Sequence, residues 1–334
     1  MTDPRATVRL PALDGWRGIA ILLVLADHFQ PIFLHAYPVA CGKHGVTAFF
    51  VLSGYLITGK LRHSNRLGVF YTRRMFRLMP VAWCYLAFVA LIGSGAPQMH
   101  LSVSEFVSSL LFVRNYFDLR FSSHTLHFWS LSIEEQFYLI WPALLLWLGM
   151  RRAKWIALAS AVGSALWLAT HHSFYSAPFM NLRTEVRGDA LLVGCAMALF
   201  LNSDVATRLF NRWTRWAFWP TTVYLAWVSL YGPDLSSLLE CCAWGVVIVY
   251  STMSAPRFLT IRPLVWLGRI SYSVYVWNLM AMQLYVAARG YFVIQMVAVG
   301  VPVLSYYLIE RPCTDAGRSV RLPFSRTKAL KEAV

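Results

Sequence analysis

Apolar runs long enough to cross a lipid bilayer recur along the whole of this 334-residue chain, separated by short polar connections. A helix needs about 20 mostly apolar residues to span a hydrocarbon core of roughly 30 Å. Inside lipid each segment must satisfy its own backbone hydrogen bonds, which a helix does. The pattern therefore predicts an all-α, polytopic bundle of about ten transmembrane helices. The predicted spans are 15–35, 45–61, 78–96, 129–150, 154–171, 188–202, 216–231, 235–253, 270–289 and 291–309.

The distribution of basic residues predicts how this bundle is oriented. Lys and Arg are enriched in the cytoplasmic connections of membrane proteins. With the N-terminus inside, 24 of the 30 Lys and Arg residues fall on cytoplasmic segments and six on the other side. We therefore expect both termini in the cytoplasm. Residues 1–312 form one predicted transmembrane domain and 313–334 form a basic cytoplasmic tail. We expect the chain after Glu310 to be short, basic and mobile.

One apolar segment, residues 102–113, is too short to be a span. It begins with Ser102 and Glu105 at the spacing of a capping box and continues for about twelve residues. If it crossed the membrane, every later basic cluster would lie outside. We therefore expect an interfacial or re-entrant helix on the extracytoplasmic side.

Composition excludes a soluble protein and a nucleic-acid-binding protein. Apolar residues make up 58% of the chain and charged residues only 13%, whereas soluble domains carry about 25% charged residues. The net charge of +15 lies in short clusters between apolar runs, so we expect no nucleic-acid partner. The six cysteines show no metal-ligand spacing, and we expect no metal site.

The first predicted span, DGWRGIAILLVLADH, carries the strongest signal for chemistry. It places Asp27 and His28 side by side inside the membrane, where ionisable groups mark functional sites. Arg17 lies eleven residues before His28, which is three helical turns with about 20° left over, so both project from one face. The competing interpretation is a structural polar contact inside the bundle.

The fourth predicted span brings two acids to a similar depth. It enters from outside, which puts Glu134 and Glu135 about 8–10 Å down the helix, while His28 lies about 20 Å up from the inside. A carboxylate at this level could orient the imidazole and raise its basicity. Alternatively, Ser132 and Glu135 have the spacing of a capping box.

Three further groups of polar residues are candidates for binding. Arg73, Arg74 and Arg77 form a guanidinium cluster on one helix, suited either to phosphates or to membrane anchoring and anionic lipids. The segment RTEVRGD contains Arg187 and Asp189 and could form an outer mouth for a hydroxyl-rich acceptor. Polar groups also lie inside predicted spans, namely Asn278 and Glu240, the latter without an identified partner.

Taken in order, seven motifs resemble those of the acyltransferase-3 family of membrane proteins. They are DGWRGIAILLVLADH, GVTAFFVLSGYLI, FYTRRMFRLMP, WSLSIEEQFYLIWP, RGDALLVG, ISYSVYVWNL and IERP. The resemblance extends from Leu13 to Pro312. That family includes O-antigen, exopolysaccharide, Nod-factor and macrolide O-acyltransferases.

The resemblance implies an enzyme of the bacterial inner (plasma) membrane that transfers an acyl group. The donor would be acyl-CoA, with acetyl-CoA favoured, and the acceptor a hydroxyl of a carbohydrate or glycosylated small molecule. The essential Arg and His of the family fall on Arg17 and His28, its Arg-x-x-Arg pair on Arg74 and Arg77, and its acid on Glu134 or Glu135, with Glu134 favoured.

These correspondences suggest roles for each residue. His28 would be the general base or a transient acyl carrier, oriented by Asp27 and Glu134, while Arg17 would stabilise an oxyanion or bind a coenzyme A phosphate. Arg73, Arg74 and Arg77 would bind the donor phosphates, and Glu135, Arg187, Asp189 and Asn278 would bind substrate. Asn278 replaces a His that is common in the family. Some O-antigen acetylating members of the family carry a hydrolase-like domain after the bundle; we expect none here, which weighs against a specific assignment to O-antigen.

An alternative from another class is a proton-coupled transporter or flippase. In that protein, His28 and the buried acids would be relay groups. We see no paired halves with the character of inverted repeats, which many such transporters have.

Overall fold

The computed structural model describes residues 10–33, 41–62, 66–95, 101–117, 124–171, 180–201, 204–231, 238–288 and 291–320. Within these ranges the chain is helical and contains no strand, which confirms the all-α prediction. The helices are α1 (Pro11–Phe33), α2 (Gly42–Leu61), α3 (Leu67–Gly95), α4 (Val103–Leu110), α5 (Phe128–Thr170), α7 (Thr184–Phe200), α8 (Asp204–Tyr231), α9 (Leu238–Ser254), α10 (Arg262–Ala288), α11 (Tyr291–Gln295), α12 (Val301–Ser305) and α13 (Arg311–Ser319).

Each predicted span coincides with a helix over most of its length. The fourth and fifth are joined in α5 across a kink at Gly149, whose backbone has φ 70° and ψ 158°. Two helical stretches in the described residues are long and apolar enough to cross a membrane by length and composition, Leu67–Gly93 and Phe128–Thr170. Helix α9 is apolar but shorter. The number of spans and their orientation stay predictions.

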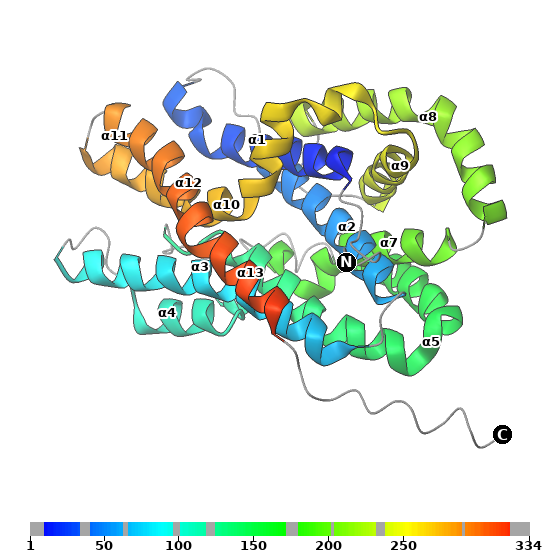
Figure 1. Cartoon of the computed structure of the whole chain (residues 1–334), viewed down its shortest axis with the longest axis horizontal. Coiled ribbons are helices and arrows are strands. Elements are labelled where there is room, and N and C mark those ends of the chain that lie inside the picture. The colour runs from blue at the N-terminus through cyan, green and yellow to red at the C-terminus, as the bar shows by residue number, and fades with distance from the viewer. Residues whose placement is uncertain are drawn as a thin grey trace.

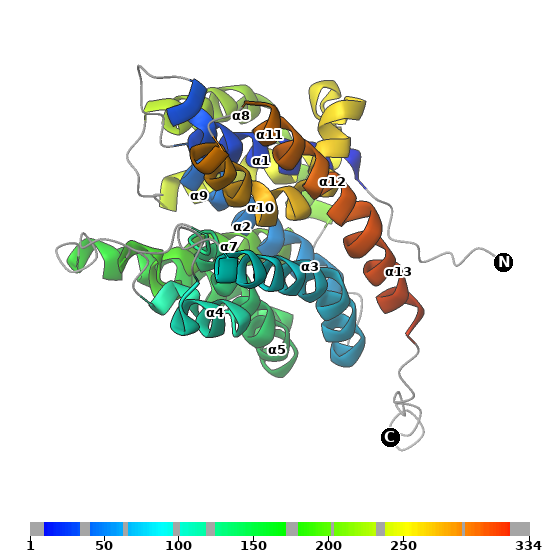
Figure 2. The same cartoon turned by 90° about the vertical axis from the view of Figure 1, so that its left-hand side faces the viewer.

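Close helix crossings fix the centre of the bundle. Helix α1 packs along α10, and α2 packs along α7 (Figures 1 and 2). A side chain at Gly268 of α10 would overlap the carbonyl oxygen of Asp14, and one at Gly54 of α2 would overlap that of Leu191. Small residues let helix backbones approach in this way. These crossings hold α1, with its ionisable residues, directly against α10.

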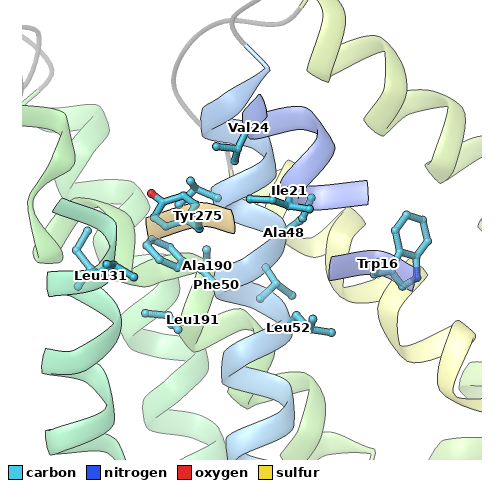
Figure 3. Packing of buried hydrophobic residues seen from close by; sticks show 14 of the residues in the cluster. Trp16, Ile21, Val24, Ala48, Phe50, Leu52, Leu131, Ala190, Leu191 and Tyr275 are labelled. Atoms are coloured by element: carbon cyan, nitrogen blue, oxygen red, sulfur yellow. The ribbon is translucent and has the colours of Figure 1, made fainter. Parts of the chain in front are cut away.

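The hydrophobic core lies where these pairs of helices meet. Figure 3 shows Ile21 of α1, Phe50 of α2, Leu131 of α5, Leu191 of α7 and Tyr275 of α10 around the same region. All of them belong to one cluster of buried side chains. The core therefore ties five helices together around the polar groups described below.

Two predictions about the shorter segments have different outcomes. The capping box at the start of α4 is confirmed, because the Ser102 side chain accepts from the Glu105 backbone while Glu105 accepts from the Ser102 backbone. The expectation of a mobile tail directly after Glu310 is wrong for residues 311–319. These residues form α13, which continues directly from the π-helical segment Tyr306–Glu310 and packs against α3 (Figure 1).

Candidate active site

His28 is held by an amide from the neighbouring helix α10. Its Nδ1 lies 2.6 Å from Oδ1 of Asn278, and Asn278 Nδ2 donates to the Tyr275 carbonyl at 2.5 Å. Because a carbonyl only accepts, the second bond fixes which end of the amide is nitrogen. Asn278 Oδ1 must therefore accept from an Nδ1–H of His28. This tautomer leaves the lone pair of the neutral imidazole on Nε2.

Asn278 thus contacts the imidazole itself. The sequence suggested that Asn278 binds substrate and that a carboxylate orients His28. In the structure the amide is 1% exposed and occupies the orienting position. Sequence spacing could not reveal this contact, because 250 residues separate the two side chains.

Asp27, the residue before His28, faces helix α2. Its carboxylate is against Gly42, so that a Cβ there would be 2.7 Å from Oδ2. Gly42 is the first residue of α2, where the helix dipole favours a negative charge. Asp27 still acts on His28 through its charge.

Glu134 does not hold His28 in this structure. It accepts from Ser53 at 2.5 Å and from Tyr138, and it forms an ion pair with Arg74 at 3.4 Å. The Arg74 guanidinium also lies over the Tyr138 ring, 3.3 Å from its centroid. In this structure Glu134 therefore pairs with Arg74, and not with His28 as the sequence predicts.

Glu135 lies beside this pair and interacts electrostatically with Arg74 and Glu134. The predicted capping box with Ser132 is wrong. Helix α5 begins at Phe128, and Ser132 is one turn inside it, where its hydroxyl donates to the Phe128 carbonyl at 2.8 Å. The same hydroxyl accepts from the Arg114 backbone at 3.0 Å.

The predicted arginine cluster on helix α3 is unevenly exposed. Arg73 is exposed, whereas Arg74 and Arg77 are half-buried. The positive charge of Arg77 acts on Arg17 of α1. The charges of both arginines act in turn on Lys60, at the end of α2. The four cations Arg17, Lys60, Arg74 and Arg77 are named the inner basic cluster.

Acids partly balance the inner basic cluster. Asp14 pairs with Arg17 at 3.1 Å and with Arg269 at 3.7 Å. Glu310 interacts with Arg77 and accepts from Ser273 at 2.7 Å. The sequence analysis did not identify Lys60 or Glu310 as part of a site. Only the motif IERP, which contains Glu310, gave a signal for the latter.

The predicted outer mouth is not formed by Arg187 and Asp189. These two side chains are 3% and 4% exposed. Arg187 lies over the Trp129 ring at 5.7 Å, and Asp189 accepts from the Ala190 backbone at 2.7 Å. Helix α7 packs closely on α2 and α5 at this point, which buries its polar residues. Arg183 and Glu185, which begin the same segment, pair nearer the surface at 3.5 Å.

A buried imidazole–carboxylate pair was also missed. His44 of α2 lies 3.0 Å from Glu240 of α9, and each side chain is 1% exposed. Glu240 also accepts from Trp244 Nε1 at 3.2 Å. His44 therefore supplies the partner that sequence analysis could not identify.

A second imidazole, His127, lies near His28. It is buried at the start of α5 and interacts electrostatically with His28. Its ring packs edge-on against Tyr85 at 5.3 Å and Tyr275 at 5.8 Å. The sequence signal that could have identified His127 is its position directly before the FWSL segment of α5. Among the described residues, no group of three His, Cys, Asp or Glu side chains could hold a metal ion.

Comparisons with known proteins agree with this arrangement of motifs. The family model described as "Acyltransferase domain" matches residues 10–308. The peptidoglycan O-acetyltransferase OatA of Listeria monocytogenes is 31% identical over 80% of this chain and 49% of its own length. The O-acetyltransferase OatA of Staphylococcus aureus is 26% identical over 96% of this chain and 58% of its own length.

The chain spans about half the length of these curated relatives. No solved structure matches it. The family model nevertheless covers most of the chain, including α1, α3, α5 and α10, which carry the His28–Asn278 contact and the Arg74–Glu134 pair. This chain therefore belongs to the acyltransferase-3 family.

Proposed function

We propose that this protein is a multi-pass membrane O-acyltransferase. It transfers an acetyl or other short acyl group from acyl-CoA to a carbohydrate hydroxyl, with acetyl-CoA as the favoured donor. The observation that carries the proposal is the His28–Asn278 contact on α1, the helix that three turns away carries Arg17 of the inner basic cluster. Family membership supports acyl transfer as the reaction class.

The imidazole supplies general base catalysis in this proposal. Asn278 holds Nδ1–H, so Nε2 is the nitrogen that takes the proton from the acceptor hydroxyl. A fixed tautomer matters because a base must present its lone pair in the correct direction. The Asp27 charge stabilises the imidazolium that forms. The deprotonated oxygen then attacks the thioester carbonyl, and coenzyme A leaves as the thiolate.

The inner basic cluster is the proposed site for the donor phosphates. Arg77 and Arg74 can bind phosphate oxygens bidentately, and Lys60 adds a third positive charge. Arg17 is the member of this cluster that lies on α1 with His28, and it could bind a phosphate or stabilise the oxyanion of the reacting thioester. Carboxylates lie against three of its four cations, since Asp14 pairs with Arg17, Glu134 pairs with Arg74 and Glu310 interacts with Arg77. The fourth cation, Lys60, lies close to the other three and to Arg318.

The proposed acceptor is a sugar hydroxyl of peptidoglycan or a related glycan. Two relatives are named as O-acetyltransferases, and the name of one of them gives peptidoglycan as its substrate. Purified protein should release coenzyme A from acetyl-CoA faster when peptidoglycan fragments are added. An exopolysaccharide fragment and a buffer blank are the comparisons. No release of coenzyme A, with or without acceptor, would contradict acyl transfer and favour a transporter.

The proposed topology has both termini in the cytoplasm and ten spans. Reporter fusions at Val334 and after Gln98, which lie outside the described residues, should read inside and outside respectively. The reason is the bias of Lys and Arg toward one side of the predicted spans. If both reporters give the same location, the ten-span arrangement is wrong.

The Arg77→Lys variant should bind acyl-CoA more weakly than the unmodified protein. Lysine keeps the charge and the topology signal but loses the bidentate guanidinium fork. Hydrogen bonds to charged groups contribute about 1.5–3 kcal/mol, so the Kd should rise roughly 10- to 100-fold. Calorimetric titration of the purified protein with acetyl-CoA measures this effect.

Arg73→Lys is the matched control, because Arg73 is four residues away on the exposed face of α3. Its affinity should be unchanged. If both variants bind acetyl-CoA with equal affinity, Arg77 has a structural or lipid-facing role and does not bind the donor.

A further inference from the structure

Helix α8 carries three arginines that play no part in the site above. Arg208, Arg212 and Arg215 are spaced by four and three residues, so they share one face of the helix. Together with Trp216 they line one wall of a pocket of about 600 Å³, and Tyr250 and Ser254 of α9 line the other. None of these six residues is an acid. The pocket is named the α8–α9 pocket.

The charge of the α8–α9 pocket favours an anion. The end of α9 at Ser254 contributes about half a negative charge through the helix dipole, which offsets only a small part of three guanidinium charges. Guanidinium groups bind phosphate oxygens bidentately, and tryptophan and tyrosine can pack against the rest of such a ligand. A phosphate-bearing group is therefore the ligand chemistry that this pocket fits.

The tryptophans of α8 indicate where that phosphate comes from. Trp213, Trp216 and Trp219 are 75%, 79% and 61% exposed, on a helix of a membrane-protein family. Exposed tryptophans collect at the headgroup level of a bilayer. The arginines alternate with them over two turns of the same helix, so the pocket opens at that level.

We propose that the α8–α9 pocket binds the phosphate headgroup of an anionic membrane lipid. Basic pockets between helices on the cytoplasmic side bind such headgroups in membrane proteins. This site is separate from the inner basic cluster proposed for the donor. Lipid binding at the α8–α9 pocket does not require acyl transfer, so this proposal can be tested independently of the proposed function.

The test compares lipid binding by purified full-length variants. The triple variant Arg208→Lys/Arg212→Lys/Arg215→Lys keeps the charge and the topology signal but loses the bidentate geometry. A second triple variant with Gln at the same positions removes the charge. The matched control, Arg151→Gln/Arg152→Gln/Lys154→Gln, removes the same charge from another connection on the side predicted to be cytoplasmic. Native mass spectrometry measures binding of short-chain phosphatidylglycerol and phosphatidylcholine.

The unmodified protein should bind phosphatidylglycerol roughly tenfold more tightly than phosphatidylcholine, which is the effect of about one charge-assisted contact. The Lys triple variant should lose most of this preference and the Gln triple variant all of it, while the control keeps it. Equal loss in the control would overturn the proposal, because the effect would then be general surface charge. It would also be overturned if coenzyme A or pyrophosphate displaced the lipid from the pocket, since the ligand would then be a soluble phosphate. If the Gln variant fails to fold, the Lys variant still decides the outcome.

Discussion

The His28→Ala variant is expected to lose 10²- to 10⁴-fold in the rate of acyl transfer while remaining folded in the membrane. This range is what a positioned general base typically contributes. Within the described residues His28 makes one side-chain hydrogen bond, to Asn278, so its loss should leave the bundle intact. The measurement is coenzyme A release at saturating acetyl-CoA and acceptor, with gel filtration in detergent to confirm folding.

Asn278→Ala provides the companion result. It leaves the imidazole in place but removes the group that fixes Nδ1–H. The rate should fall by less than in His28→Ala, and the binding of acetyl-CoA should be unchanged. Near-normal transfer by purified His28→Ala protein would show that the Asp27–His28 region is structural.

The His44→Ala variant is expected to lower the stability of the bundle by about 3–5 kcal/mol, the typical cost of breaking a buried pair by removing one partner. His44 and Glu240 join α2 to α9 at 3.0 Å with almost no exposure to solvent. Removing His44 takes away one partner of a buried carboxylate, which also accepts from Trp244 Nε1 at 3.2 Å. Thermal unfolding in detergent should show a clearly lower Tm.

Two further variants distinguish the pair from a general packing defect. Adding Glu240→Gln to His44→Ala should recover part of the loss, because the carboxylate is then uncharged. Arg183→Ala is the control, since it breaks the half-exposed pair with Glu185. Partly exposed pairs contribute about 0–1 kcal/mol, so the Tm should hardly change. No recovery in the double variant would attribute the effect of His44 to packing alone.

The sequence predicts much of the helical architecture because apolar runs have a strong periodic signal. It places Arg17 and His28 on one helix face, and α1 is continuous through both. It also predicts the capping box of α4 from two residues, because that signal is local. Such features depend on neighbours a few positions apart, which a sequence displays directly.

Contacts between distant helices could not be derived in the same way. Depth along the membrane was known only to about one turn, so it could not decide between Asn278 and Glu134 as the partner of His28. Arg73 is exposed while Arg74 and Arg77 are half-buried, a difference that their spacing does not reveal. The close packing of α7 on α2 buries Arg187 and Asp189, which looked like a surface mouth. The partners and the burial of these side chains depend on how the helices cross.

The central claim is that His28 acts as a base in transfer from acyl-CoA to a hydroxyl. Purified protein incubated with labelled acetyl-CoA and no acceptor should carry no label on the peptide containing His28. Adding peptidoglycan fragments should then move label to the fragments, and the transfer rate should rise with pH as the imidazole loses its proton. Stoichiometric label on the His28 peptide before acceptor is added, or no label on the fragments afterwards, would contradict this account.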